Sequence, residues 1–381
     1  MRIAINTRFL LPDKLEGLGW YTHEICRRLV ANHPEDEFFF LFDRPYDSNF
    51  IFGPNVHPVA VFPPARHPVL WYLWFERRLP AVLEKIRPDV FFSPDGFLSL
   101  RSRIPTVMVT HDLAFRHFPT QIPRSVNLYY HYFTPRYLEH AQNIITVSDF
   151  VKADIQQQYG ISSEKIISVH NGCREGFKPL DPQEIQKVRD KYAVGCPYFF
   201  YLGALHPRKN LTRLIEAYSI FRQMCGTEIK LVIGGRIAWQ TGDLFKVWKA
   251  SPYRNDIIFT GYLPEEELSK ILGAAFALTY VSLFEGFGLP VLEALYSEIP
   301  IIASDKASIP EVAGPAALLV NPFDEEAIAH AMRKLWEDPL LRESLLQKGR
   351  HQRQKFSWDR AAQEIYQVLE HVSGTASNTS S

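Results

Sequence analysis

The stretch SLFEGFGLPVLEA, residues 282–294, carries the pattern from which we infer the fold. An apolar run ends at Ser282, the chain turns through Gly286-Phe287-Gly288, and a helical pattern follows near Pro290, a residue favoured in the first turn of a helix. A buried strand that leads through a glycine-rich turn into a helix is the repeating unit of a parallel α/β sheet. The stretch therefore predicts a strand–turn–helix unit at the carboxyl edge of such a sheet.

Apolar runs of the same kind recur along the chain in two series. We expect strands at residues 2–6, 37–42, 90–93, 106–112, 143–148 and 165–169, and again at 198–205, 229–235, 257–263, 275–282, 300–304 and 317–322. Helical patterns lie between most of them. Near-continuous apolar strands that alternate with helices indicate parallel sheets covered on both faces. Two series of about six strands favour two doubly wound, Rossmann-like α/β domains over one very wide sheet.

A segment with two prolines separates the two series. Residues 177–186, FKPLDPQEIQ, show little apolar periodicity, so we place the linker there and expect domains at 1–178 and 179–356. Residues 357–372 have the pattern of an amphipathic helix capped by a serine. The small polar residues that follow, 373–381, predict a disordered tail.

The composition limits the classes of function. The 381 residues are 46% hydrophobic, and 42 Lys plus Arg balance 42 Asp plus Glu, which argues against a dedicated nucleic-acid binder. The four scattered cysteines match neither a disulfide framework nor a zinc site. The first residues predict a strand rather than a signal peptide, and no apolar run approaches the ~18 residues of a membrane-spanning helix. We therefore expect a soluble, cytoplasmic protein.

Two carboxylates flank the glycine turn, Glu285 before it and Glu293 in the helix after it. The backbone amides of residues 286–289 stand at the start of that helix, where unpaired N–H groups attract phosphate. Carboxylates accept hydrogen bonds from sugar hydroxyls. This layout suits a nucleotide sugar, with phosphate at the turn and hydroxyls at both carboxylates. The alternative is an ordinary strand–turn–helix whose Glu293 complements the helix dipole.

Positive charge for a diphosphate is available in LGALHPRKN, residues 202–210. Arg208 and Lys209 precede a predicted helix at the carboxyl end of another strand. The alternative is a solvated pair at a helix start, but cations there oppose the helix dipole unless an anion is present. At 4 Å and an effective dielectric constant near 20, one pair of opposite charges is worth about 4 kcal/mol. Both side chains are therefore candidates for binding the diphosphate.

The ordered set of motifs resembles the retaining glycosyltransferases of family 4, which have the GT-B fold. The resemblance covers nearly the whole chain and rests on EGLGWYTHEI (16–25), VTHDLAF (109–115), TVSDFVKADI (146–155), HNGC (170–173), LGALHPRKN (202–210), FEGFGLPVLEA (284–294) and SDKASIPEVAGPAALLVNP (304–322). The chain departs from the family's pattern at Trp20 and Ala204, where arginine is common. The resemblance implies two Rossmann-like domains facing a central cleft, with helix 357–372 returning to the first, acceptor-binding domain.

The resemblance also implies roles for single residues. Arg208 and Lys209 would bind the donor diphosphate, assisted by the amides of Gly17 and Gly19 from the other domain. The remaining donor contacts would come from Glu285, Gly286, Phe287, Gly288 and Leu289 around the transferred sugar, and from Glu293 on the ribose. His111 would contact the donor sugar near the reacting centre, although a histidine at a strand end can also be a core residue. Asp112 is either an acceptor-side residue or, as we prefer, a structural cap.

For the chemistry, the resemblance implies a front-face displacement with retention and without a metal or other cofactor. His111, Arg208, Lys209 and Glu285 would form the catalytic set. No Asp-x-Asp pair ends a strand, and the two cations can supply the positive charge that a metal would.

The preferred reaction moves mannose from GDP-mannose to a glycan or lipid-linked saccharide in polysaccharide biosynthesis. UDP-glucose or a further nucleotide sugar could serve as donor for the same type of transfer. The fold is also compatible with a sugar-nucleotide epimerase, a glucan synthase or a non-catalytic subunit that binds sugar nucleotides.

Residues 71–88, WYLWFERRLPAVLEKIRP, mix aromatic and basic side chains. A helix of this composition can rest on the inner face of a membrane and meet a lipid-linked acceptor. More often such aromatics form the buried face of a domain helix. We favour burial and keep peripheral membrane contact as a hypothesis.

Overall fold

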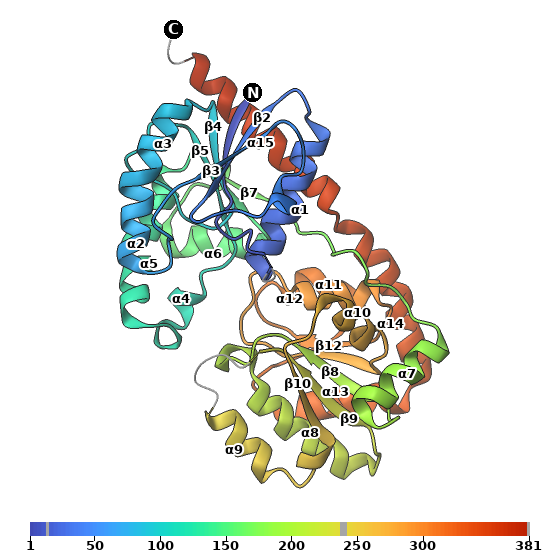
Figure 1. The fold of residues 1–381 in the computed structure, drawn as a ribbon. Helices are drawn as coiled ribbons and strands as arrows, with labels where there is room; N and C mark the ends of the chain where they lie inside the picture. The colour runs from blue at the N-terminus through green and yellow to red at the C-terminus, as the bar shows by residue number, and fades with distance from the viewer. Residues whose placement is uncertain (13–14, 237–241, 379–381) are drawn as a thin grey trace. The chain divides into compact units, whose positions relative to one another are not determined.

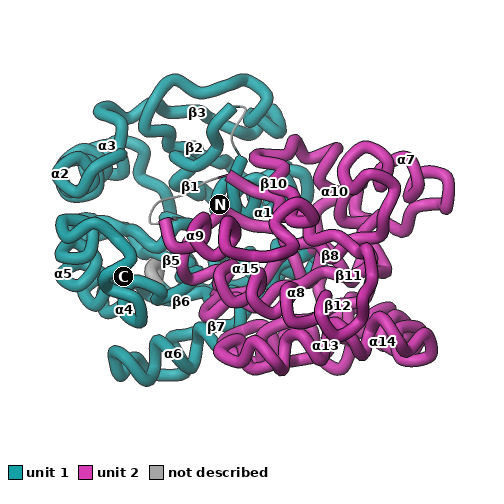
Figure 2. The backbone as a smooth tube through the Cα atoms, turned by 90° about the horizontal axis from the view of Figure 1, so that it is seen from below, with its two compact units in different colours: residues 1–172, 357–381 teal, residues 173–356 magenta. Residues whose placement is uncertain are grey.

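The structure is a computed structural model that describes residues 1–12, 15–236 and 242–378. The chain forms two compact α/β units (Figures 1 and 2). The first unit contains residues 1–172 and 357–381, and the second contains residues 173–356. Each unit is built around its own parallel sheet.

The first unit holds a seven-stranded parallel sheet in the order β3-β2-β1-β4-β5-β6-β7. Its strands are β1 (Arg2–Asn6), β2 (Glu37–Phe42), β3 (Val56–Ala60), β4 (Val90–Ser93), β5 (Thr106–Thr110), β6 (Asn143–Thr146) and β7 (Ile166–Ser168). Its helices are α1 (Gly17–Asn32), α2 (Pro68–Leu73), α3 (Leu79–Ile86), α4 (Ala114–His117), α5 (Arg124–His140), α6 (Asp149–Tyr159) and α15 (Trp358–Asn378).

The second unit holds a six-stranded parallel sheet in the order β10-β9-β8-β11-β12-β13. Its strands are β8 (Tyr198–Leu202), β9 (Lys230–Gly234), β10 (Ile257–Gly261), β11 (Ala277–Tyr280), β12 (Ile301–Ser304) and β13 (Leu318–Val320). Its helices are α7 (Pro182–Ala193), α8 (Leu211–Cys225), α9 (Gly242–Ala250), α10 (Glu265–Gly273), α11 (Leu289–Tyr296), α12 (Ile309–Ala313), α13 (Glu325–Glu337) and α14 (Pro339–Gln352). In chain order the sheet reads 3-2-1-4-5-6, the strand order of the Rossmann fold.

All twelve predicted apolar runs contain a strand, because buried parallel strands are apolar on both faces. Every side chain of β4, β5, β11 and β12 is buried. The sequence analysis missed β3, the edge strand of the first sheet. Pro58 interrupts it, and proline is tolerated in a sheet mainly at an edge, where its missing N–H breaks no ladder bond.

The units meet in sequence at residues 172 and 173, six residues before the expected boundary. The reason is packing, because the segment after Gly172 already belongs to the second unit. Phe177 is buried there, and the Arg174 guanidinium lies 5.2 Å from its ring centre. The expected linker, residues 177–186, includes the start of α7, whose cap Asp181 accepts hydrogen bonds from the next turn.

The last helix, α15, packs on α1 in the first unit and is longer than expected. Ser357 caps its start, where the hydroxyl accepts a bond from the Arg360 amide at 3.4 Å. Residues 373–378, which we expected to be disordered, continue the helix. The hydroxyls of Ser373 and Thr375 donate to carbonyls one turn earlier, so these polar residues are satisfied within the helix. Residues 379–381 of the expected tail lie outside the described residues.

Candidate functional site

In the second sheet, strands β9 and β10 are added on one side of β8, and strands β11 to β13 are added on its other side. The strand order therefore reverses between β8 and β11, which are hydrogen-bonded neighbours. At such a switch point the loops after the two strands part, and open α/β sheets bind ligands in the crevice between them. The loop after β8 holds Arg208 and Lys209, and the loop after β11 holds residues 281–288 and leads into α11 at Leu289. The structure therefore brings the two predicted phosphate-binding and carboxylate segments to one edge.

Lys209 and Glu285 form the central ion pair of this edge. The Lys209 Nζ donates to Glu285 Oε1 at 2.6 Å and to the Tyr280 hydroxyl at 3.2 Å. The two charged side chains are only 15% and 10% exposed. Burial alone would raise the pKa of Glu285, but Lys209 and then Arg208 lower it below its ordinary value. The carboxylate is therefore held ionised as an acceptor, next to a cation of fixed position.

Backbone contacts tie the cationic loop to the carboxylate loop. Arg208 donates from Nη1 to the Phe284 carbonyl at 3.0 Å, and its own carbonyl accepts from the Leu283 amide at 2.9 Å. Asn210 is buried in the left-handed region, with φ of 62°, and its side-chain amide donates to the Val281 carbonyl at 3.0 Å. These contacts fix the position of Arg208 relative to the loop after β11.

A serine from a third loop supports the glycine turn. The Ser308 Oγ lies 2.9 Å from the carbonyl oxygens of both Glu285 and Phe287. Gly288, with φ of 103°, caps the start of α11, and a Cβ there would lie 2.6 Å from Ile309 Cδ1. Glycine is required here because the left-handed backbone and the close neighbour both exclude a side chain.

Glu293 lies in α11 and is 1% exposed. Its Oε1 accepts from Arg174 Nε at 3.0 Å and from Nη2 at 2.6 Å. Its Oε2 is buried without a hydrogen-bond partner among the described residues. A buried carboxylate oxygen without a donor is costly, so this atom is a candidate ligand for a hydroxyl. The sequence analysis missed Arg174, although it directly follows the HNGC motif at 170–173.

In the first unit, His111 follows β5 at the carboxyl edge. Its Nε2 lies 2.7 Å from the Pro94 carbonyl, which can only accept, so Nε2 carries the proton. The ring makes an edge contact with Tyr21 at 4.7 Å. Burial lowers the pKa of His111 below its ordinary value. The imidazole is therefore neutral at pH 7, with Nδ1 as its acceptor.

The other predicted residues of the first unit have simpler surroundings. Gly17 and Gly19 lie in the first turn of α1, whose N–H groups have no acceptor within the helix. A Cβ on Gly19 would lie 2.8 Å from the Phe9 carbonyl, so glycine is needed there for packing. Asp112 Oδ1 accepts from the Ala114 amide at 2.9 Å, a local contact at the start of α4.

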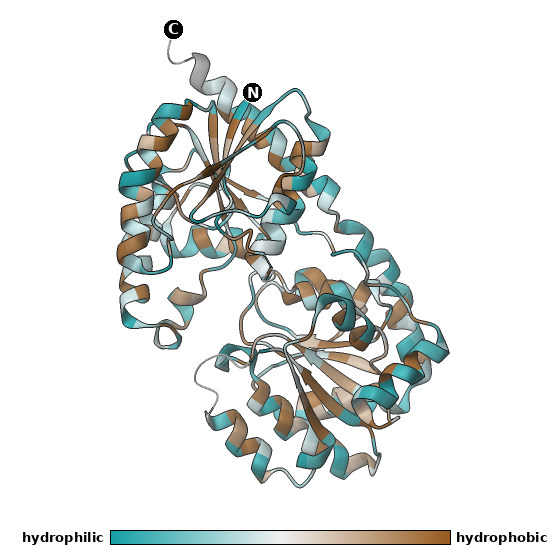
Figure 3. Cartoon of the chain, viewed as in Figure 1, coloured by the Kyte–Doolittle hydropathy of each residue, from teal (hydrophilic) through white to brown (hydrophobic). Residues whose placement is uncertain are grey.

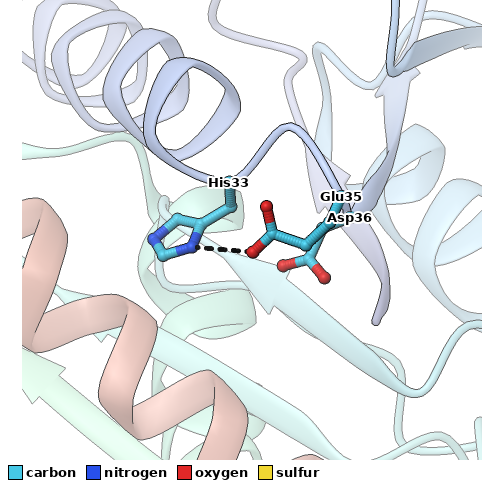
Figure 4. A group of neighbouring side chains, drawn as sticks. All are labelled: His33, Glu35 and Asp36. Carbon is cyan, nitrogen blue, oxygen red and sulfur yellow. Dashed lines mark ion pairs between the residues drawn. The ribbon is translucent and has the colours of Figure 1, made fainter.

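Within a single unit, one group of potential metal ligands occurs among the described residues: His33, Glu35 and Asp36 (Figure 4). His33 Nδ1 lies 3.6 Å from Glu35, and its ring stacks on Tyr366 at 3.4 Å. Both oxygens of Asp36 are occupied, one by the Met1 ammonium at 2.6 Å and one by the Tyr366 hydroxyl at 2.8 Å. This group joins the end of α1 to α15 and has a structural role.

Comparisons with known proteins show which families the two halves of the chain match. Residues 183–352 match the family described as glycosyl transferases group 1, and residues 15–175 match glycosyltransferase family 4. O-antigen chain mannosyltransferase B of Escherichia coli is 29% identical over 364 residues, which cover 91% of this chain and 93% of that protein.

Two solved structures are similar over nearly their whole length. Sucrose-phosphate synthase from Thermosynechococcus elongatus has a TM-score of 0.79 at 18% identity, with 98% of this chain and 99% of that chain covered. Anabaena HepE, in complex with UDP and glucose, has a TM-score of 0.76 at 18% identity, with 97% and 100% covered. At these identities the likeness shows the fold alone, which is the GT-B fold.

Proposed function

The chain belongs to the glycosyltransferases of family 4, and from this premise we propose that it transfers mannose from GDP-mannose to a glycan or lipid-linked saccharide in polysaccharide assembly. That it is a glycosyltransferase follows from both family matches and from the mannosyltransferase relative. One observation carries the proposed donor site. Lys209 follows β8, and Glu285 and Glu293 follow β11, the neighbouring strand of the same sheet. Lys209 and Glu285 form a buried ion pair there, and Glu293 Oε2 has no hydrogen-bond partner among the described residues.

In the proposed complex, the donor diphosphate lies against Arg208 and Lys209. The Gly288 and Leu289 amides, just before Pro290 at the start of α11, add donors, because a helix N-terminus attracts phosphate. Glu285 accepts hydrogen bonds from hydroxyls of the transferred sugar, and Glu293 Oε2 accepts from the ribose. Arg174 saturates the other oxygen of Glu293, so a single acceptor atom remains for the ligand.

The proposed transfer needs no carboxylate nucleophile. The acceptor hydroxyl oxygen bonds to the anomeric carbon on the face from which the diphosphate departs, which retains the configuration. The bond between that carbon and the diphosphate oxygen breaks, and the acceptor proton passes to the diphosphate. Lys209 and Arg208 stabilise the negative charge that develops on the leaving group, a contribution of about 2.7–4 kcal/mol per well-placed donor in other enzymes.

His111 is proposed to orient the donor sugar. Its Nε2–H is committed to the Pro94 carbonyl, and burial keeps its pKa low, so it is a weak base that presents Nδ1 to a hydroxyl. Gly17 and Gly19 remain proposed phosphate contacts through their backbone amides.

We also propose that the transfer is independent of metal. The Lys209 ammonium and the Arg208 guanidinium supply the positive charge that a divalent cation supplies in other transferases. The test is turnover in the presence of a chelator, with Mg²⁺ added back. Unchanged turnover supports the proposal, and a requirement for Mg²⁺ overturns it.

The proposed sugar, mannose, rests on the relative that is named as a mannosyltransferase. The proposed nucleotide, GDP, rests on the resemblance to bacterial family members that use GDP-mannose. A second candidate donor is UDP-glucose, because the HepE structure of the same fold holds UDP and glucose. The identity of the nucleotide in the donor is therefore the first property to determine.

The experiment is thermal unfolding in the presence of GDP-, UDP-, ADP- and dTDP-sugars. A ligand at 100 times its dissociation constant stabilises the folded state by about 2.7 kcal/mol. We expect a shift with GDP-mannose that Lys209→Ala and Glu293→Ala both lose. A shift with UDP-glucose alone would replace the proposed donor. A shift that both variants retain would show that the donor binds elsewhere.

Among the described residues, no helix is long and apolar enough to cross a bilayer. We propose that the protein works at the inner face of the membrane by peripheral contact, since a lipid-linked acceptor would be presented there.

A further inference from the structure

Exposed apolar side chains gather on two helices of the first unit. Seven large hydrophobic residues of that unit are exposed among those described, and five belong to α2 and α5: Val69, Tyr72, Leu73, Leu128 and Tyr132. Leu128 is 73% exposed and Val69 is 68% exposed. Single exposed apolar residues need no explanation, but a group on adjoining elements marks an interaction surface. We call these five residues the α2–α5 surface.

The two helices lie along each other (Figure 1). Trp71 makes ring contacts with Tyr129 at 5.2 Å and with Tyr130 at 5.9 Å, and Tyr72 contacts Phe133 at 6.2 Å. Leu128 and Tyr132 are four residues apart on α5 and therefore share one side of that helix. The hydropathy colouring shows apolar segments of α2 on the outer side of this unit (Figure 3).

This surface overlaps only in part with residues 71–88, the segment that the sequence analysis considered, because Tyr72 and Leu73 belong to both. Trp74 and Phe75, the central aromatics of residues 71–88, are 0% exposed and form core of the unit. The preference for burial of this segment is confirmed for them. The exposed apolar residues come from α2, where Tyr72 and Leu73 begin the segment 71–88 and Val69 precedes it, and from α5, which lies about fifty positions later in the sequence.

The charges around the α2–α5 surface are mostly positive. Residues 62–84 and 113–140 contain three carboxylates: Glu76 is buried and accepts from the Leu100 amide at 3.1 Å, whereas Glu84 and Glu139 are exposed. The same two segments carry six exposed arginines: Arg66, Arg77, Arg78, Arg116, Arg124 and Arg136. The whole chain has no net charge, so this excess is local. The partner of such a surface is negatively charged.

The arginines and the aromatics also interact with each other. The Arg136 guanidinium lies 3.8 Å from the centre of the Tyr132 ring and donates to the Tyr132 carbonyl. Tyrosine can keep its hydroxyl in water while its ring is buried, and arginine can do the same with its guanidinium and its long apolar stem. Both side chains therefore suit a boundary between water and hydrocarbon. A partner protein that bound the arginines through its carboxylates would not need the exposed apolar side chains of this surface.

We propose that the α2–α5 surface docks on an anionic lipid bilayer, with Leu128, Val69 and the tyrosines at the headgroup boundary and the arginines on the lipid phosphates. This inference is independent of which nucleotide sugar the second unit binds. It assigns the membrane contact to named residues outside the donor site.

The test is cosedimentation of the full chain with vesicles at low salt. The probes are vesicles of phosphatidylglycerol mixed with phosphatidylcholine, and vesicles of phosphatidylcholine alone. We expect binding to the anionic vesicles and its release at high salt, since salt shortens the range of the attraction. The double variant R124Q/R136Q should bind about thirtyfold more weakly, which is about 2 kcal/mol for two arginines near an anionic surface.

Matched controls come from the second unit. The apolar variant Leu128→Gln should weaken vesicle binding, whereas Leu340→Gln, at a residue 83% exposed on α14, should not. Arg333→Gln, on α13, is the corresponding charge control. Thermal shift with nucleotide sugar checks that every variant keeps its fold and its donor site.

Three results would overturn the proposal. The first is no binding to anionic vesicles, and the second is equal loss in the variants and their controls. The third is self-association of the chain that Leu128→Gln abolishes while vesicle binding persists, which would assign the surface to a second copy.

Discussion

Removing the Arg174 guanidinium is the perturbation that tests the site most directly. Its Nε and Nη2 hold Glu293 Oε1, and the two side chains are 11% and 2% exposed. In Arg174→Met the carboxylate would stay buried with no cation beside it. Breaking a buried pair from one side costs about 3–5 kcal/mol. For a unit of this size, 1 kcal/mol lowers Tm by about 2–4 °C, so we expect a loss of roughly 6–20 °C.

The assay is thermal unfolding of Arg174→Met beside a matched control, Arg333→Met. Arg333 pairs with Glu337 on the surface at 3.5 Å, and exposed pairs along one helix contribute about 0.3–0.5 kcal/mol. The control should therefore change Tm by less than about 2 °C.

Adding Glu293→Gln to Arg174→Met should recover part of the loss, because the buried charge is then gone. This double variant should still fail to bind the donor. Equal Tm values for Arg174→Met and the control, or no recovery in the double variant, would refute the assigned pairing.

Three further predictions concern pH and backbone strain. Burial by itself would raise the pKa of Glu285, but Lys209 and Arg208 together hold it below 4.5. The stabilisation from this ionised carboxylate is complete above pH 4.5 and is lost as pH falls through the lower folded-state value, so the Tm difference between wild type and Glu285→Gln should shrink at acid pH. Burial holds the pKa of His111 below 6.5, so the unfolded chain binds that proton more readily and stability falls as pH drops below 6.5; His111→Gln should show a smaller fall in Tm. Gly288→Ala should unfold at lower denaturant, by about 1–3 kcal/mol, because its backbone has φ of 103° and the new Cβ meets Ile309; an unchanged midpoint would contradict the strain.

The loops of the donor site were predictable because each is local in sequence. Residues 282–294 indicate a strand, a glycine turn and a helix within thirteen positions, and Lys209 stands between a buried strand and a helix start. Parallel strands bring their carboxyl ends to one edge, so two such loops meet wherever their strands are neighbours. The neighbours β8 and β11 realise that expectation.

The partner of Glu293 could not be predicted in this way. Arg174 lies 119 positions away, and no periodicity relates the two residues. The same holds for Ser308, whose hydroxyl supports the turn from another loop. Such pairs depend on which segments the fold places together, and a local pattern reports only the burial of its own segment.

The sequence by itself determined the two Rossmann-like units, the positions of nearly all strands along the chain, and the kind of side chain at each strand end, since buried strands and helix starts have local signatures. Only the tertiary structure decided which oxygen of Glu293 has no hydrogen-bond partner among the described residues, that the His111 Nε2–H is committed to a carbonyl, and that α2 and α5 share one basic, apolar surface. These properties arise between residues that are distant in sequence, and they exist only once packing has removed water from one side of each group.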